Sequence, residues 1–373
     1  MILHLKSFVF LLIVVVSIAH GYEPIDYQTA KNLTADYCYV NSYNEVDSIV
    51  KSCRYIVIQG FEVPAGKTLN LNLQKKTVLL FEGTLTFGMA YWDGPLISIS
   101  GYDIQVMGGT NHLIHGHGEK YWDGQGDGGV KKPRKVMTIN AHGGSFKNIN
   151  IKNCPLFCVA IVGTDLTFSG FNIDLQDGFN NNLGRNTDGM SFSQSNNILI
   201  ENCKIWNQDD CVNVLGGSTN SLVRNVHCWG SHGFSITSGM ADSEKLNSIS
   251  NITFEDSSIG GSLGGIHVKT LPTGGPGILD RITYRNIQIT DVTRFAIEAH
   301  QDYPNEDGKS SNNIKITNLN LIGVTGTVKG SSTRSVRINC GSGSCSNWNW
   351  SGIKITGAQN KDECNFHPNG YSC

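Results

Sequence analysis

The sequence predicts an all-β fold, a single-domain right-handed parallel β-helix that forms a solenoid of about ten coils. Short segments of one pattern, a polar residue followed by alternating apolar residues, recur along the chain. The isoleucines Ile252, Ile282 and Ile314 of three such segments lie 30 and 32 residues apart, a period typical of solenoids. A β-propeller, the alternative fold, requires blade repeats of about 40 residues or more.

Each segment predicts one short strand. Gly, Asn, Asp and Ser separate the segments and leave no room for helices between them. In a parallel β-helix such strands stack about 4.8 Å apart, so that apolar residues line a continuous core while asparagine and glycine occupy the corners. The segments in chain order are residues 148–153, 197–202, 251–256, 281–286 and 313–318.

The composition excludes several classes of partner. The 29 Lys+Arg nearly balance the 31 Asp+Glu, for a formal net charge of −2, so no overall field would hold a nucleic acid or an anionic membrane. Charged residues make up only 16% of the chain and glycine supplies 43 residues, which argues against long, charged surface helices. We therefore expect no nucleic-acid and no membrane partner, and a monomer.

Residues 1–21 have the pattern of a secretory signal peptide. Lys6 precedes an apolar run from Phe8 to Ile18, and the small residues of Ala19-His20-Gly21 follow at a suitable cleavage position. No later stretch approaches the ~20 apolar residues of a membrane span. The sequence predicts a secreted, extracellular protein whose mature domain spans residues 22–373; an uncleaved anchor is the alternative.

Eleven cysteines fit an oxidising destination. Short spacings suggest four disulfides, so that Cys154, Cys158 and Cys203 are left over and at least one thiol stays free, which we expect to be buried. No pair of CxxC elements supports a zinc site. The suggested pairs are Cys38–Cys53, Cys211–Cys228, Cys340–Cys345 and Cys364–Cys373, and acceptor sequences for N-glycosylation begin at Asn32, Asn251 and Asn349.

Four side chains have spacings that a coil would convert into a cluster. Asp188, Asp210 and His232 are separated by two equal steps of 22 residues, which places them on one face of three consecutive rungs if a coil takes about 22 residues there. Asp209 joins them only if the chain bends, because neighbouring residues of a regular strand point to opposite sides. Crowding raises the pKa of at least one carboxyl, and this supplies the protonated acid and ionised base of glycoside hydrolysis.

Taken singly, each motif is more typical of an ordinary turn or a surface group, and only their coincidence indicates a site. The ordered set resembles the polygalacturonases of glycoside hydrolase family 28, and the likeness covers nearly the whole mature chain. The matching motifs are Asn186-Thr-Asp188, Asp209-Asp210, His232-Gly233, Lys269, Gln301-Asp-Tyr303 and Tyr121-Trp-Asp-Gly124. The four short-range cysteine pairs are similar to those of the fungal-type members.

This resemblance implies an inverting, endo-acting hydrolase of α-1,4-galacturonosyl bonds in pectin or polygalacturonate, without cofactor or metal. It implies Asp209 as the general acid, and Asp188 and Asp210 as the groups that hold and deprotonate the attacking water. Plant polygalacturonase-inhibiting proteins are the implied protein partner. The other implied roles are tuning of the carboxylates by His232, orientation by Asn186, and binding of the sugar by Lys269 and Tyr303.

Two positions depart from the family pattern. Ser231 stands where the family has a glycine, and His267 stands where it has the arginine of an Arg-Ile-Lys motif. His267 shares a strand face with Lys269, so we predict that it binds substrate; an imidazole of ordinary pKa, about 6.5, would imitate arginine only when protonated. The alternatives are therefore a catalytically weak or silent pectin-binding relative and a hydrolase of a modified galacturonan.

Overall fold

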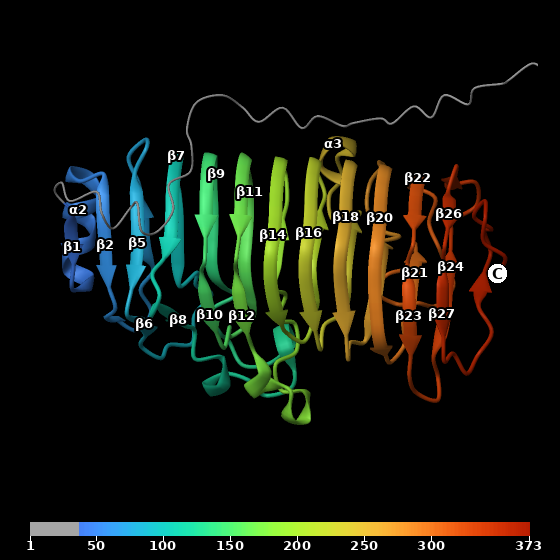
Figure 1. The fold of residues 1–373 in the computed structure, drawn as a ribbon, viewed down its shortest axis with the longest axis horizontal. Coiled ribbons are helices and arrows are strands. Elements are labelled where there is room, and N and C mark those ends of the chain that lie inside the picture. The colour runs from blue at the N-terminus through green and yellow to red at the C-terminus, as the bar shows by residue number, and fades with distance from the viewer. Residues whose placement is uncertain (1–36) are drawn as a thin grey trace, which may run out of the picture.

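The computed structural model describes residues 37–373, which form the predicted right-handed parallel β-helix. Figure 1 shows the strands side by side along the long axis, in chain order from the first described residues to the C-terminus. The predicted signal peptide, residues 1–21, lies outside the described residues. No helix in the described part of the chain is long and apolar enough to cross a membrane.

Three parallel ladders join the coils. The first, which we call the site ladder, runs through eleven of the described strands. These are β4 (Leu69–Asn72), β7 (Ile97–Gly108), β9 (Lys135–Lys147), β11 (Phe157–Ser169), β13 (Met190–Phe192), β15 (Asp210–Leu215), β17 (Gly233–Ser238), β19 (Gly264–Thr270), β21 (Phe295–His300), β24 (Arg334–Asn339) and β28 (Glu363–Cys364).

The second ladder shares long strands with the first, and the third shares long strands with the second. The second ladder passes through β7, β9 and β11 and adds β1 (Cys38–Val40), β2 (Tyr55–Gln59), β5 (Val78–Glu82), β14 (Asn196–Trp206), β16 (Thr219–Trp229), β18 (Ile249–Gly260), β20 (Gly277–Val292), β22 (Ile314–Ile322), β25 (Cys345–Ser346) and β26 (Asn349–Ser351). The third passes through β14, β16, β18 and β20 and adds β3 (Glu62–Val63), β6 (Thr84–Phe87), β8 (Leu113–His115), β10 (Asn150–Lys152), β12 (Asn172–Asp174), β23 (Thr325–Val328) and β27 (Lys354–Thr356).

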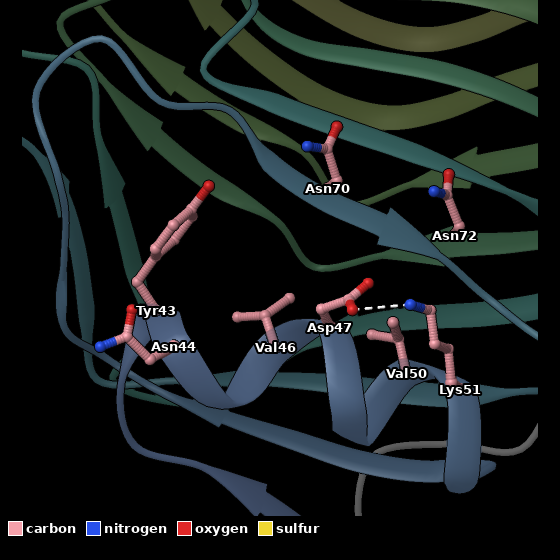
Figure 2. A pocket seen from close by; sticks show the side chains of 8 residues that line it. All are labelled: Tyr43, Asn44, Val46, Asp47, Val50, Lys51, Asn70 and Asn72. Atoms are coloured by element: carbon pink, nitrogen blue, oxygen red, sulfur yellow. Dashed lines mark hydrogen bonds and ion pairs between the residues drawn. The ribbon is translucent and has the colours of Figure 1, made fainter.

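The described helices are short and lie at the N-terminal end or in turns. Val46 and Val50 of α2 (Val46–Ser52) are buried against the core, while its other face carries an exposed Lys51–Asp47 ion pair of 2.6 Å. Figure 2 shows this face, which lines a pocket with Asn70 and Asn72 of β4. The other helices are η1 (Tyr43–Glu45), η2 (Gly118–Lys120), η3 (Gly126–Gly128), η4 (Gln176–Gly178), η5 (Asn180–Asn182) and α3 (Glu244–Asn247).

Equivalent apolar residues of successive coils stack into one core. Phe254 and Tyr284 lie opposite each other on successive coils with ring centroids 4.8 Å apart, and Phe234, from another strand of the same coil as Phe254, packs against Phe254 at 5.4 Å; all three rings are fully buried. Burial of each such side chain contributes roughly 1.5–3 kcal/mol. Because each coil packs only on its neighbours, the positions of side chains on adjacent rungs are set by the register.

The register agrees with the predicted repeat over one step and departs from it over the next. Ile252 lies opposite Ile282, as the 30-residue spacing predicts. Ile282, however, lies opposite Leu319, and Ile314 pairs with Gly277. Leu319 lies five residues beyond Ile314, and the longer turn after β21 accommodates these five residues. Sequence likeness between segments therefore does not by itself place them at equivalent coil positions.

Asparagines occupy many of the corners, as predicted. Asn220 and Asn251 have positive φ, the left-handed conformation that asparagine tolerates better than other side chains. Their amides form a ladder across coils, in which Asn251 donates to Asn220 and Asn220 donates to Asn196, each over 2.8 Å. A second such step joins Asn225 to Asn202 over 2.7 Å.

The four suggested disulfides are all present, and a fifth joins Cys154 to Cys158. Cys203 is the free thiol and is buried, as expected. Burial raises its pKa to about 12, so this thiol stays protonated and unreactive.

Removal of the Cys211–Cys228 disulfide should destabilise the site ladder. The bond spans 17 residues and links β15 to the end of β16, and closing a loop of this length in the unfolded chain is worth about 3 kcal/mol. Guanidinium unfolding of the double variant Cys211→Ala/Cys228→Ala checks this. Cys364→Ala/Cys373→Ala, at the C-terminal end, is the matched control; an equal unfolding free energy for the Cys211 variant and the parent would contradict the prediction.

Candidate active site

A sharp bend brings two consecutive aspartates to one side of the site ladder. The buried amide of Asn207 donates to the backbone carbonyls of Asp209 and Asp210, both over 2.9 Å. The backbone N–H of Asp210 donates to Oδ1 of Asp209 over 2.8 Å. The bend therefore allows the side chains of both Asp209 and Asp210 to enter the site.

Asp188 reaches the same place from the coil before. It lies two residues before β13, and its backbone carbonyl accepts a hydrogen bond from Cys158, next to the Cys154–Cys158 disulfide. Met190 pairs with Val212, a step of 22 residues, so Asp188 is one coil below Asp210 as the spacing predicts.

The second step of 22 residues is interrupted by a bulge. The register shifts between Asp210 and Val212, so Gly233 lies opposite Asp210. His232 is therefore beside Asp209 and not beside Asp210: its N–H donates to the Asp209 carbonyl, and its Nδ1 is 3.2 Å from Oδ1 of Asp209. Asn186 completes this group by donating to Oδ2 of Asp209 over 2.8 Å.

Asp210 is held by a buried ion pair. Lys269, two coils later on β19, places Nζ 2.8 and 3.1 Å from its two carboxylate oxygens. Ser235 donates to Oδ1 over 2.6 Å and Asn213 to Oδ2 over 2.7 Å. These four donor contacts occupy most of the acceptor positions of the Asp210 carboxylate.

The pKa values of Asp188 and Asp209 are shifted in opposite directions. Burial and then the charges of Asp209 and Asp210 raise the pKa of Asp188 well above its usual range. Burial alone would also raise the pKa of Asp209, but His232 and then Lys269 hold it well below its usual range. Burial opposes charge on His232, yet Asp209 raises the pKa of the imidazole above its ordinary value. The empty site therefore favours a neutral Asp188 and a charged Asp209–His232 pair.

Ser231 is accommodated without strain. Its φ is not positive, and its buried hydroxyl accepts a hydrogen bond from the Gly233 N–H over 3.1 Å and contacts Ser262 at 3.2 Å. The residue that has to be glycine is Gly233, with φ of 96°, where an added Cβ would lie 1.9 Å from the Gly265 carbonyl oxygen. The hydroxyl of Ser231 therefore helps to fix the turn before His232.

The predicted binding residues lie on the C-terminal side of these carboxylates. Tyr303 places its ring 4.8 Å from Nζ of Lys269, and His267 contacts Tyr303 edge to face, with centroids 6.2 Å apart. Burial and then the charge of Lys269 lower the pKa of His267 well below its ordinary value. An imidazole with a lowered pKa favours the neutral form, in which His267 does not imitate an arginine.

Several polar residues that line up with His267 at the site were not singled out from the sequence. They occupy one row of the site ladder, where each lies opposite the next and faces away from the core. A polar residue between two buried apolar residues on each strand was the available signal, but alignment of the strands requires the register. The row is Ser191, Asn213, Ser235, His267, Glu298 and Arg337.

Two sets of side chains at the site resemble metal ligands in type. Donor atoms of Asp209, Asp210 and His232 lie within 4.8 Å of one another, as do those of His267, Glu298 and His300. In the first set, Lys269 already supplies a cation to the carboxylates. In the second, the imidazole Nε2 atoms face each other at 3.0 Å, a hydrogen-bonding distance, which leaves no room for an ion between them.

Known proteins are similar to this chain in both sequence and fold. The polygalacturonase of Phaedon cochleariae is 40% identical over 344 residues, which cover 90% of this chain and 93% of the relative. Endopolygalacturonase I of Aspergillus niger is 37% identical over 343 residues, 91% of this chain and 92% of the relative. Endopolygalacturonase I of Stereum purpureum, solved with two galacturonates, superposes with a TM-score of 0.81 at 30% identity, over 90% of this chain and all of that one.

Residues 53–373 match the sequence family described as glycosyl hydrolases family 28. The match covers the whole site ladder from β4 to β28, with the carboxylates near its middle. The chain therefore belongs to glycosyl hydrolase family 28.

Proposed function

We propose that the protein is a polygalacturonase that cuts α-1,4-galacturonosyl bonds within pectin chains, with inversion. One observation carries the proposal: three carboxyls, two of which have pKa values shifted in opposite directions, are grouped beside a buried lysine and an imidazole. Hydrolysis of a glycosidic bond needs a proton donor and a base on opposite faces of the sugar. Extensive likeness to endopolygalacturonases supports the substrate and the endo mode.

In the proposed mechanism Asp209 and His232 act together as the proton donor. The pair holds one proton, which resides on His232 in the empty site because Asp209 stabilises the imidazolium. As the leaving oxygen develops negative charge, the proton passes through Asp209 to that oxygen. Asn186 keeps Oδ2 of Asp209 oriented for this transfer.

Asp188 is the proposed base. Its raised pKa makes the ionised form a stronger base than an ordinary carboxylate, and catalysis uses this form. Activity should therefore rise with pH as Asp188 ionises and fall as His232 loses its proton. Asp210 contributes a fixed negative charge that helps to hold the water, and Lys269 and Tyr303 bind the sugar.

One observation favours the opposite assignment, in which Asp188 is the general acid and Asp209 the general base. The same raised pKa leaves Asp188 protonated in the empty site. The Asp209 variants described in the Discussion distinguish the two assignments.

Product sizing tests the proposed function. We expect demethylated polygalacturonate to yield a ladder of oligomers early in the reaction, with reducing ends appearing in proportion. Galacturonate alone would contradict the endo mode. Binding of the polymer without any product would support the silent relative.

The proposal extends to the setting of the enzyme. The signal-peptide pattern supports secretion, and the sequon residues Asn251 and Asn349 are exposed, so both could carry glycans. An extracellular enzyme of this kind would meet pectin in plant cell walls, along with plant polygalacturonase-inhibiting proteins.

A further inference from the structure

A hydrogen-bonded chain of three side chains ends at the substrate-binding face. Nδ1 of His300 is 2.8 Å from Oδ1 of Asp302, and both side chains are fully buried. Nε2 of His300 is 3.0 Å from Nε2 of His267, whose side chain is 13% exposed. The ring planes are within 9° of each other and the centroids are 5.2 Å apart. The distance between the ring centroids exceeds the distance between the two Nε2 atoms by about two ring radii. The two Nε2 atoms therefore lie on the line between the ring centres and face each other.

The direction of each proton follows from the partners. Asp302 also accepts from Gly308 and Asn339 and contacts Arg337, and a carboxylate can only accept, so Nδ1 of His300 donates to it. With the Nδ1 proton directed at Asp302, Nε2 of His300 is the acceptor at the 3.0 Å contact, and His267 donates to it. Oε2 of Glu298, 3.5 Å from the same His267 nitrogen, favours a proton there and would repel a lone pair.

This arrangement leaves Nδ1 of His267 without a proton. Among the described residues no hydrogen bond to it is found, and it is not one of the fully buried unpaired atoms, so it keeps some access to solvent; Lys269 lies two residues along the same strand. The cations nearby have carboxylate partners: Lys269 has Asp210. Arg337 and Arg294 likewise have Glu298 and Glu306. A sugar carboxylate facing His267 would therefore meet a lone pair and no unpaired cation.

We propose that Asp302 and His300 fix His267 as a neutral hydrogen-bond acceptor, which makes it the residue that selects a galacturonate unit with an uncharged, methyl-esterified carboxyl. Nδ1 would accept a sugar hydroxyl, and an ester beside it avoids the repulsion that a carboxylate would meet. The inference rests on the proposed function for its substrate. His267 is the specificity-determining residue, while His300 and Asp302 are positioning residues.

The substrate test compares two oligogalacturonides of equal length, one free of esters and one fully methyl-esterified. We expect the parent protein to favour the esterified oligomer in kcat/KM. His267→Arg should shift that ratio toward the free acid by about tenfold or more, the effect of one charge-assisted contact. His227→Arg, an exposed histidine on β16, is the matched control and should leave the ratio unchanged. An unchanged ratio in His267→Arg, or a parent preference for the free acid, would overturn the inference.

Calorimetric binding of the same two oligomers separates this inference from the proposed function. If the parent cleaves neither oligomer, the proposed function fails, and the ratio of the two Kd values still tests the selectivity. If the parent cleaves both oligomers and His267→Arg leaves the preference between them unchanged, the proposed function stands and the role of His267 is refuted.

The proton positions are tested directly by NMR of histidine labelled with nitrogen-15. We expect His267 to carry its proton on Nε2 and His300 on Nδ1 between pH 5 and pH 7. His300→Phe removes the acceptor and should release His267 to a mixture of tautomers, whereas His300→Gln keeps an acceptor oxygen and should preserve the parent tautomer. A parent His267 protonated on Nδ1 would overturn the proposal, whether or not the variants fold.

Discussion

Asp209→Asn should lower kcat by about 10³-fold while the protein stays folded, because general acid catalysis contributes 10²–10⁴-fold and asparagine has no proton to transfer. KM should change little, since Asn186 can still hydrogen-bond the new amide. The pKa of His232 should fall, because the charge of Asp209 raises it. Steady-state kinetics and histidine NMR titration measure these effects.

A leaving group that needs no proton identifies the donor. With an oligogalacturonosyl fluoride, Asp209→Asn should regain most of the parent rate, whereas Asp188→Asn should stay slow because it lacks the base. If Asp188 is instead the donor, the two variants exchange their behaviour. Slow turnover of the fluoride by both variants would remove the donor role from each.

Lys269→Met should destabilise the protein by roughly 3–5 kcal/mol, the cost of leaving a buried charge without its partner. The side chains of Lys269 and Asp210 are only 5% and 3% exposed, and Nζ lies within hydrogen-bonding distance of both carboxylate oxygens. The pair joins β19 to β15 across the intervening strand β17, so its loss loosens three coils. Urea unfolding measures the effect.

The double variant Lys269→Met/Asp210→Asn is the control for this interpretation. It removes the unpaired charge and should recover part of the lost unfolding free energy, which a double-mutant cycle quantifies. Equal destabilisation by the double and single variants would mean that packing of the lysine stem, and not charge, accounts for the loss.

Equal spacing of 22 residues predicted the position of Asp188 relative to Asp210, but His232 lies one residue away from the position opposite Asp210. The step from Asp188 to Asp210 matches the register, because both strands are regular there. The step from Asp210 to His232 crosses a bulge that Asn207 helps to fix through backbone carbonyls. A bulge of this kind depends on buried hydrogen bonds between residues whose proximity the sequence does not reveal.

The surroundings of His267 were beyond prediction for a related reason. Its shared face with Lys269 follows from alternation along one strand, and the two side chains do face the same site. Its pKa is lowered by burial and then by Lys269, and its hydrogen-bond partner His300 lies on the next coil. The length of each coil varies with its turns, as the displaced Ile314 shows, so contacts between coils could not be read from spacing alone. Ser231 was misjudged because its hydroxyl takes part in the turn.

The asparagine ladders at the corners have a consequence for the lifetime of the protein. Deamidation requires the side-chain amide to swing toward the backbone nitrogen of the following residue. The amides of Asn220, Asn225 and Asn251 are each tied to the coil before, and their left-handed backbone is fixed by the ladders on either side. The hydrogen bonds that space the coils should therefore also slow deamidation of these asparagines.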